Sequence, residues 1–71
     1  MARDAIIRKV NPYELHGVRH YQIFLSFEDT PESVREVRLA HDAVYPSPSD
    51  GDRVSVETLL SMVTEVRKKA D

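Results

Sequence analysis

The chain has 71 residues, which suits one small domain, and we expect this domain to span residues 1–71. Hydrophobic residues make up 41% of the sequence and charged residues 31%, a composition typical of folded globular proteins and unlike that of disordered chains. Ten basic and twelve acidic residues give a net charge of -2, so the basic excess common in nucleic-acid-binding proteins is missing.

The absence of cysteine excludes a disulfide framework, a thiolate nucleophile and a cysteine zinc site. No uninterrupted apolar run approaches the roughly eighteen residues of a transmembrane helix. The apolar stretch at residues 5–7 is too short for the core of a signal peptide. We therefore expect a cytoplasmic protein.

The first predicted element is a strand over residues 5–10, which are rich in β-branched side chains. Asn11-Pro12 follows, and a residue before proline is restricted to extended or turn conformations, so we expect the strand to end here. Residues 11–17 are then interpreted as a connection, with Gly17 in a turn conformation that other residues avoid.

The clearest pattern is the alternation of apolar and polar side chains over residues 19–27, which predicts a half-buried strand. Its apolar positions are Tyr21, Ile23, Leu25 and Phe27. A polar turn at residues 28–33 and a second alternating stretch at 34–39 predict an antiparallel hairpin. Residues 40–44 suggest a single helical turn, and residues 45–52, with two prolines and Asp50-Gly51, suggest a surface loop.

The C-terminal segment allows two interpretations. As a helix over about residues 56–69, it would place several apolar side chains on one face and basic ones near its end, giving an α+β fold. As a strand, it places Val, Thr, Leu and Met at all even positions from 54 to 66. Val and Thr are abundant here and favour pleated sheets, so we favour strand, bend and strand, with the bend near residues 59–61. Residues 68–71 are expected to fray.

Five short strands predict an all-β fold, a small SH3/OB-like barrel with a short C-terminal tail. Residues 35–39 (Arg-Glu-Val-Arg-Leu) and 51–56 (Gly-Asp-Arg-Val-Ser-Val) resemble two strands of the hydrogenase maturation chaperones. With an early Val/Ile strand, this resemblance covers roughly half of the chain by pattern and implies a small barrel. The functional cysteine of that family follows the initiator Met, but here that position is Ala2, so the resemblance implies no iron chemistry and no site.

Three histidines are candidate metal ligands. His16 and His20 lie four residues apart, a spacing that metal sites use on helices, and His41 with Asp42 lies elsewhere. Gly17 and the following strand argue against a helix here, so a His-based metal site is a minor alternative and we expect no metal and no cofactor.

Catalysis has little support in this sequence. Asp50 and Asp52 flank Gly51, but an Asp-Gly-Asp triplet in a polar loop is typical of turns. No serine lies in a Gly-x-Ser-x-Gly setting, and two isolated glycines cannot form a phosphate-binding loop. We expect a protein that is not an enzyme.

Two groups of residues are candidates for binding. A basic edge would bring together Arg8, Lys9, Arg19, Arg67 and Lys68, which suggests single-stranded nucleic acid as an alternative ligand. A second set of apolar side chains lies on the strand face that is otherwise polar. It comprises Val18, Phe24, Leu59 and Val63. Because a small monomer cannot cover both faces of its strands, this set favours a non-catalytic accessory module that binds a protein partner or forms a homodimer.

Overall fold

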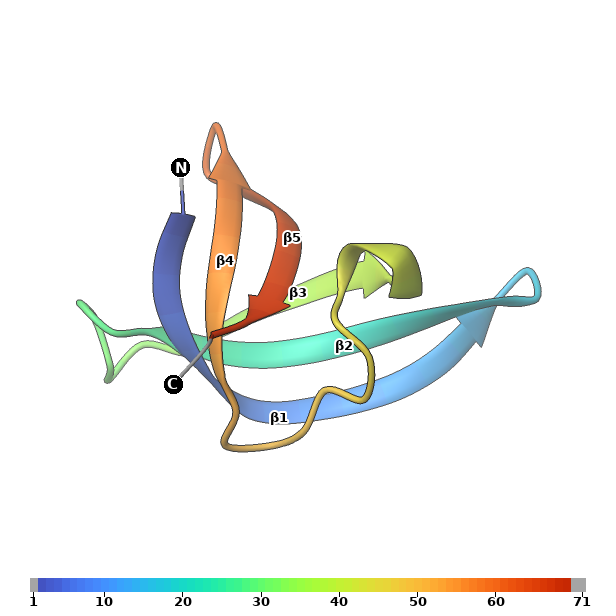
Figure 1. The fold of residues 1–71 in the computed structure, drawn as a ribbon, viewed down its shortest axis with the longest axis horizontal. Helices are drawn as coiled ribbons and strands as arrows, with labels where there is room; N and C mark the ends of the chain where they lie inside the picture. Colours follow the sequence, from blue (N-terminus) through green and yellow to red (C-terminus); the bar gives the residue numbers. More distant parts are fainter. Residues whose placement is uncertain (1, 70–71) are drawn as a thin grey trace.

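The protein folds as one antiparallel sheet of five strands, which the computed structural model describes over residues 2–69 (Figure 1). The strand order is β3-β2-β1-β4-β5. Along the chain the elements are β1 (Ala2–Leu15), β2 (Val18–Phe27), β3 (Arg35–Ala40), η1 (His41–Ala43), β4 (Arg53–Leu59) and β5 (Met62–Lys68). The all-β prediction is confirmed, as is the helical turn at residues 40–44, and the alternative with a C-terminal helix is wrong.

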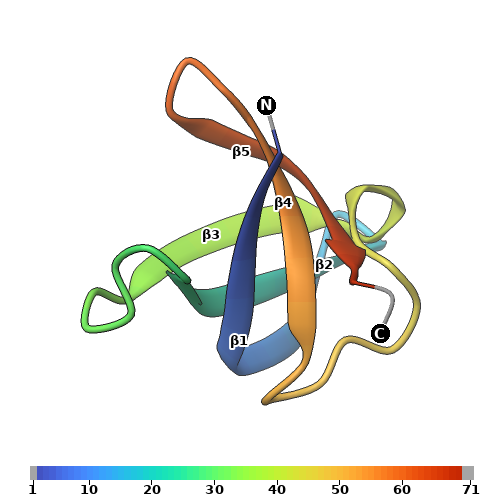
Figure 2. The ribbon, with the colours of Figure 1, turned by 60° about the vertical axis from the view of Figure 1, so that its left-hand side comes forward.

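The sheet curls strongly, but it does not close into a barrel (Figure 2). β3 and β5 are its two edges, and no strand ladder joins them. β3 ends at Ala40, and beyond η1 Val44 forms a parallel bridge with Val66 of β5. At the other end of the gap, the Arg35 guanidinium donates to the carbonyl of Ser61. The expected closed barrel is therefore corrected to an open five-stranded sheet.

β1 continues past Asn11 and Pro12, where we predicted its end, and pairs with β2 as far as Leu15. The reason lies in the ladder, in which alternate residues direct their N–H groups away from the paired strand. The N–H of Val10 points outward, because it donates to Asp50 Oδ1 at 3.0 Å. Pro12, two residues further on, therefore faces outward too, and its missing N–H removes no bond to β2.

A bulge at Arg8 bends β1 and divides the sheet. The pairing with β2 shifts between Ile7 and Lys9, so Arg8 is the extra residue. Residues 2–6 pair with β4, and residues 5–6 among them also pair with β2. Residues 11–22 form a hairpin, which we call the β1–β2 arm. Its end, beyond the last β2–β3 pair at His20 and Ala40, projects from the rest of the sheet (Figure 1).

The core lies on the concave face of the curled sheet, where the predicted alternation of β2 buries Ile23, Leu25 and Phe27. The other buried apolar residues are Ala5, Ile7, Val44, Val54, Val56 and Val66. β4 and β5 follow the predicted strand, bend and strand. Their pairing shifts so that Thr64 is an extra residue, which breaks the expected even-numbered alternation and turns Val63 toward the core.

The end of β5 is more ordered than predicted. Lys68 pairs with Val54, and Lys69 donates its backbone N–H to the Arg53 carbonyl at 3.0 Å. The Lys69 ammonium also lies 2.6 Å from an Asp4 carboxylate oxygen. The predicted frayed tail thus does not include residues 68 and 69, and residues 70–71 lie outside the described residues.

Candidate functional site

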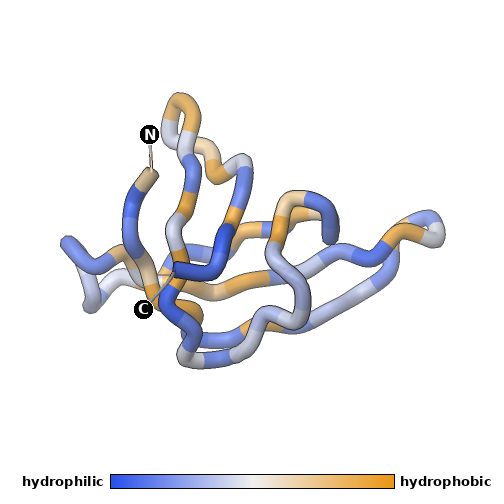
Figure 3. Tube along the Cα trace, in the orientation of Figure 1, coloured by the Kyte–Doolittle hydropathy of each residue, from blue (hydrophilic) through white to orange (hydrophobic). Residues whose placement is uncertain are grey.

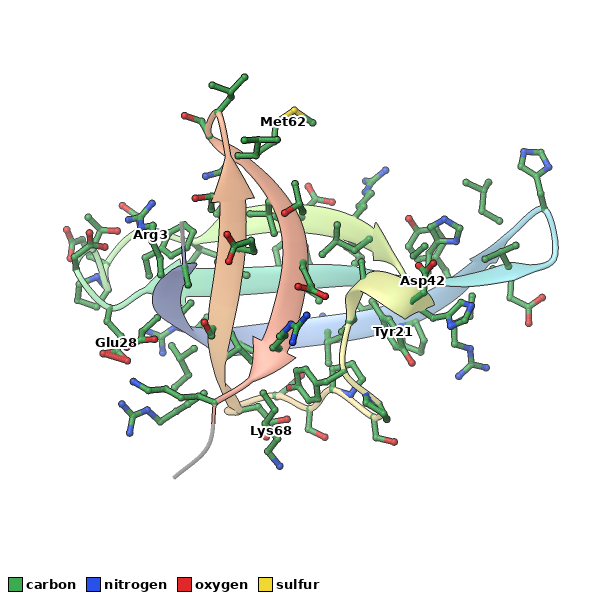
Figure 4. All side chains as sticks on the ribbon, turned by 45° about the horizontal axis from the view of Figure 1, so that its top comes forward. Arg3, Tyr21, Glu28, Asp42, Met62 and Lys68 are labelled. Carbon is green, nitrogen blue, oxygen red and sulfur yellow. The ribbon has the colours of Figure 1, made fainter. Side chains whose placement is uncertain are left out.

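The most exposed of the large apolar side chains in residues 2–69 lie at the turn between β4 and β5. Leu59, Leu60 and Met62 are 65%, 90% and 69% exposed, and we call these three residues the apolar turn. The turn is hydrophobic in Figure 3, and Figure 4 shows Met62 at the end of the hairpin, far from Tyr21 and Asp42. A hairpin end that projects these three side chains forms an exposed apolar surface, a feature typical of interaction sites.

The backbone of this turn is strained. Leu60 has a φ of 51° and Ser61 a φ of 69°, so both central residues lie in the left-handed region that such two-residue turns require. Asn-Gly is the usual sequence there, and a bulky residue in this region is unfavourable by about 1–3 kcal/mol. Leucine at this position is therefore unfavourable for the fold.

A smaller apolar pair marks the end of the β1–β2 arm. Leu15 and Val18 face each other across the turn and are 48% and 43% exposed. The turn between them places His16 and Gly17 at positive φ, as predicted for the glycine. Because this pair is less exposed than the apolar turn, it is the weaker candidate for an interface.

The predicted apolar set does not form one surface. Val18 and Leu59 lie at two different turns, and Val63 packs against the core. Phe24 is half-buried and lies opposite Glu36 of β3. Of the four residues, only Leu59 belongs to the apolar turn. Its neighbours Leu60 and Met62 were missed because the expected strand pattern placed even-numbered residues on the buried face.

The residues of the predicted basic edge lie in three places. Arg8 is the bulge residue of β1 and Lys9 follows it, Arg19 is on the arm, and Arg67 and Lys68 end β5. Arg8 donates to Ser26 Oγ at 3.2 Å and to the Pro31 carbonyl at 3.3 Å.

Acidic side chains partner much of the remaining positive charge. Arg67 donates to both carboxylate oxygens of Glu65, and these bonds raise the pKa of the guanidinium. In the same way, hydrogen bonds from Gln22 and then Arg38 lower the pKa of Glu36. Exposed pairs like these add little stability, but they leave a surface of mixed charge.

The three histidines do not form a metal site. His16 occupies the arm turn, and His20 stacks on Tyr13 with 5.5 Å between the ring centroids. His41 begins η1. Within residues 2–69, no three side chains of the His, Cys, Asp or Glu type gather closely enough to hold a metal ion.

A groove of about 400 Å³ separates the arm from η1 and the segment after it. It is lined by residues 17–19, Tyr21, His41 and residues 44–46. The Tyr45 hydroxyl donates to Asp52 Oδ2 at 2.6 Å, which fixes one end of the ring. Burial and then this bond raise the pKa of Tyr45, and the same bond lowers the pKa of Asp52.

No sequence pattern indicated this groove. The predicted hairpin of β2 and β3 could have indicated it. The register of this hairpin pairs Tyr21 with Leu39 and so brings Arg19 and Tyr21 toward His41.

The sequence matches no family model, and no curated protein or solved structure shows a significant match to this chain. Within residues 2–69, no helix has both the length and the apolar character needed to cross a bilayer.

Proposed function

We propose that this protein is a non-catalytic binding module that attaches to a protein surface through its apolar turn. The observation that carries the proposal is Leu60, which is 90% exposed on a strained two-residue turn. Exposed leucines are common singly, but here Leu59 and Met62 extend the apolar surface on either side. The first partner to test is a second copy of the chain.

The curled sheet supports a scaffold role for the fold. Its strand order, with β1 between β2 and β4, suits an open variant of a small SH3/OB-like barrel. The parallel bridge between Val44 and Val66 ties the segment after η1 to the edge strand β5. Such scaffolds serve many unrelated functions, so the fold alone does not select the partner.

The nucleic-acid alternative has weaker support. It needs one continuous positive groove, whereas the five basic residues expected to form it lie at three separate places. Salt bridges further reduce the positive charge, as at Arg67. We therefore favour protein binding.

The expected association is weak. Burying a leucine or methionine side chain contributes about 1.5–3 kcal/mol, and each copy offers three. Association itself costs about 4–15 kcal/mol, so most of this gain is offset. A homodimer formed through the apolar turn should therefore have a dissociation constant in the micromolar to millimolar range.

Sedimentation equilibrium over that concentration range tests the proposal. We expect the wild type to dimerise and the Leu59→Ser/Leu60→Ser variant to remain monomeric with an unchanged far-UV spectrum. Leu15→Ser is the matched control, because it removes an exposed leucine from the arm and should leave dimerisation intact. A wild type that stays monomeric at millimolar concentration, or a Leu59→Ser/Leu60→Ser variant that dimerises equally well, would contradict the homodimer.

A further inference from the structure

The groove between the arm and η1 has the size of a small-molecule site. Its volume of about 400 Å³ lies within the range of roughly 300–1,000 Å³ that such sites occupy. One wall consists of residues 17–19 and Tyr21, at the start of β2, and the other of His41 in η1 with residues 44–46. Figure 4 places Tyr21 beside η1, on the side of the molecule away from the apolar turn. The groove is therefore a surface independent of the proposed docking site.

Two tyrosine rings give this groove a rigid aromatic lining. Both Tyr21 and Tyr45 are half-buried and pack against the core. Tyr45 is held at both ends, because its hydroxyl donates to Asp52 and its backbone N–H donates to the Val66 carbonyl at 3.2 Å. Rings fixed in this way present a flat surface that loses little conformational freedom when a planar ligand stacks on it.

The polar groups that line the groove favour an anion. Arg19 and His41 contribute, and no carboxylate side chain is among the lining residues. Within the described part of the chain, neither side chain forms an ion pair. The nearest carboxylates by position are Glu14, opposite Arg19 in the ladder, and Asp42, next to His41. Neither of them lines the groove.

We propose that this groove binds a small planar aromatic molecule that carries an anionic group, the chemistry of a nucleoside monophosphate. The ring stacks on the tyrosine lining, and the anionic group accepts hydrogen bonds from Arg19 and His41. A free nucleotide and a nucleotide within a single strand share this chemistry. The short groove and the scattered basic residues favour the free nucleotide, because a strand needs a longer track of cations.

A titration of the isotope-labelled full chain with adenosine 5′-monophosphate tests this proposal. We expect backbone amide shifts at Gly17, Arg19, His41 and Tyr45 with saturation at millimolar concentration or below. Adenosine alone should bind more weakly, because it lacks the anion, and inorganic phosphate should not reproduce the shifts. The proposal is overturned if the monophosphate causes no saturable shifts at these residues, or if phosphate alone causes the same ones.

Substitutions at the groove test where the monophosphate binds. Arg19→Ala and His41→Ala remove exposed side chains, so both should fold, and Arg19→Ala should weaken binding of the monophosphate by about tenfold. Arg38→Ala removes an exposed guanidinium that does not line this groove and should change the affinity less than twofold. Equal affinities of wild type and Arg19→Ala would overturn the proposed site.

Two further experiments distinguish a free nucleotide from a single strand, and nucleotide binding from dimerisation. A short oligoadenylate that binds no more tightly than the monophosphate supports the free nucleotide, whereas much tighter, steeply salt-dependent binding overturns that preference in favour of single strands. The Leu59→Ser/Leu60→Ser variant should bind the monophosphate as the wild type does, because the apolar turn lies elsewhere. Loss of binding in that variant would overturn the independence of the two surfaces.

Discussion

Asp52 connects the loop before β4 to Tyr45 through one carboxylate oxygen. Oδ2 accepts the Tyr45 hydroxyl at 2.6 Å and the Ser49 N–H at 3.1 Å. Both bonds favour the ionised carboxylate, and the bond from Tyr45 is the main cause of its lowered pKa. The same carboxylate thus orders the loop and fixes a ring that lines the groove.

This arrangement predicts how stability depends on pH. Folding lowers the pKa of Asp52. The carboxylate therefore stabilises the fold at pH values above its unfolded pKa, near 3.8, and this stabilisation is lost as the pH falls through its folded pKa. Tyr45→Phe should lower the melting temperature near neutral pH, and its difference from the wild type should shrink as Asp52 becomes protonated. Thermal unfolding at a series of pH values measures both effects.

Tyr13→Phe is the control for this experiment, because Tyr13 stacks on His20 through its ring and its hydroxyl makes no hydrogen bond within residues 2–69. It should follow the wild-type curve. A difference between Tyr45→Phe and wild type that stays constant at every pH would contradict the proposed link between Tyr45 and Asp52.

At the scale of the elements, Leu60 belongs both to the proposed binding surface of the β4–β5 hairpin and to its strained turn. Leu60→Asn/Ser61→Gly substitutes the pair that such turns favour. Glycine and asparagine tolerate positive φ, so this variant should be more stable by roughly 1 kcal/mol and melt about 4–8 °C higher. Thermal unfolding by circular dichroism measures the change.

The same variant should also dimerise less, because it removes the most exposed leucine. Higher stability combined with weaker association would separate folding from binding in a single protein. His16→Asn in the arm turn is the comparison, since Gly17 already occupies the second position there. A melting temperature that is unchanged or lower in Leu60→Asn/Ser61→Gly would show that the turn is not strained.

Sequence patterns predicted the elements that depend on local alternation. β2 buries Ile23, Leu25 and Phe27 as expected, because its alternation is long and its register places one face on the core. The length of β1 was not predictable from Asn11-Pro12 alone. Whether a proline ends a strand depends on which side its nitrogen faces, and that is fixed by the partner strand.

The candidate sites were less predictable than the fold. Thr64, the extra residue of β5, shifts the alternation, so Val63 faces the core although it was expected on the second face. The groove combines Arg19 and Tyr21 with His41, residues about twenty positions apart that only the hairpin of β2 and β3 brings together. Local periodicity carries no information on such contacts.

At the scale of the whole molecule, an open sheet must protect its unpaired edges from pairing with other chains. Within residues 2–69, the outer edge of β1 beyond residue 6 has no strand partner, and its outward-facing positions are Val10, Pro12 and Glu14. Asp50 accepts the N–H of Val10, and Pro12 has no N–H to offer. The loop and the proline together leave little of this edge available for strand addition.

Removing both features should therefore create a strand edge that can pair with other copies of the chain. Pro12→Thr/Asp50→Ala restores one outward N–H and frees another, so we expect concentration-dependent oligomers, measured by light scattering after size exclusion, with native far-UV spectra. These oligomers should persist when Leu60 is also changed to serine, which distinguishes them from the dimer formed through the apolar turn. Pro31→Thr, in the exposed loop after β2, controls for loss of a proline and should behave as wild type. If the double variant has the mass of the wild type at every concentration, Pro12 and Asp50 do not protect this edge.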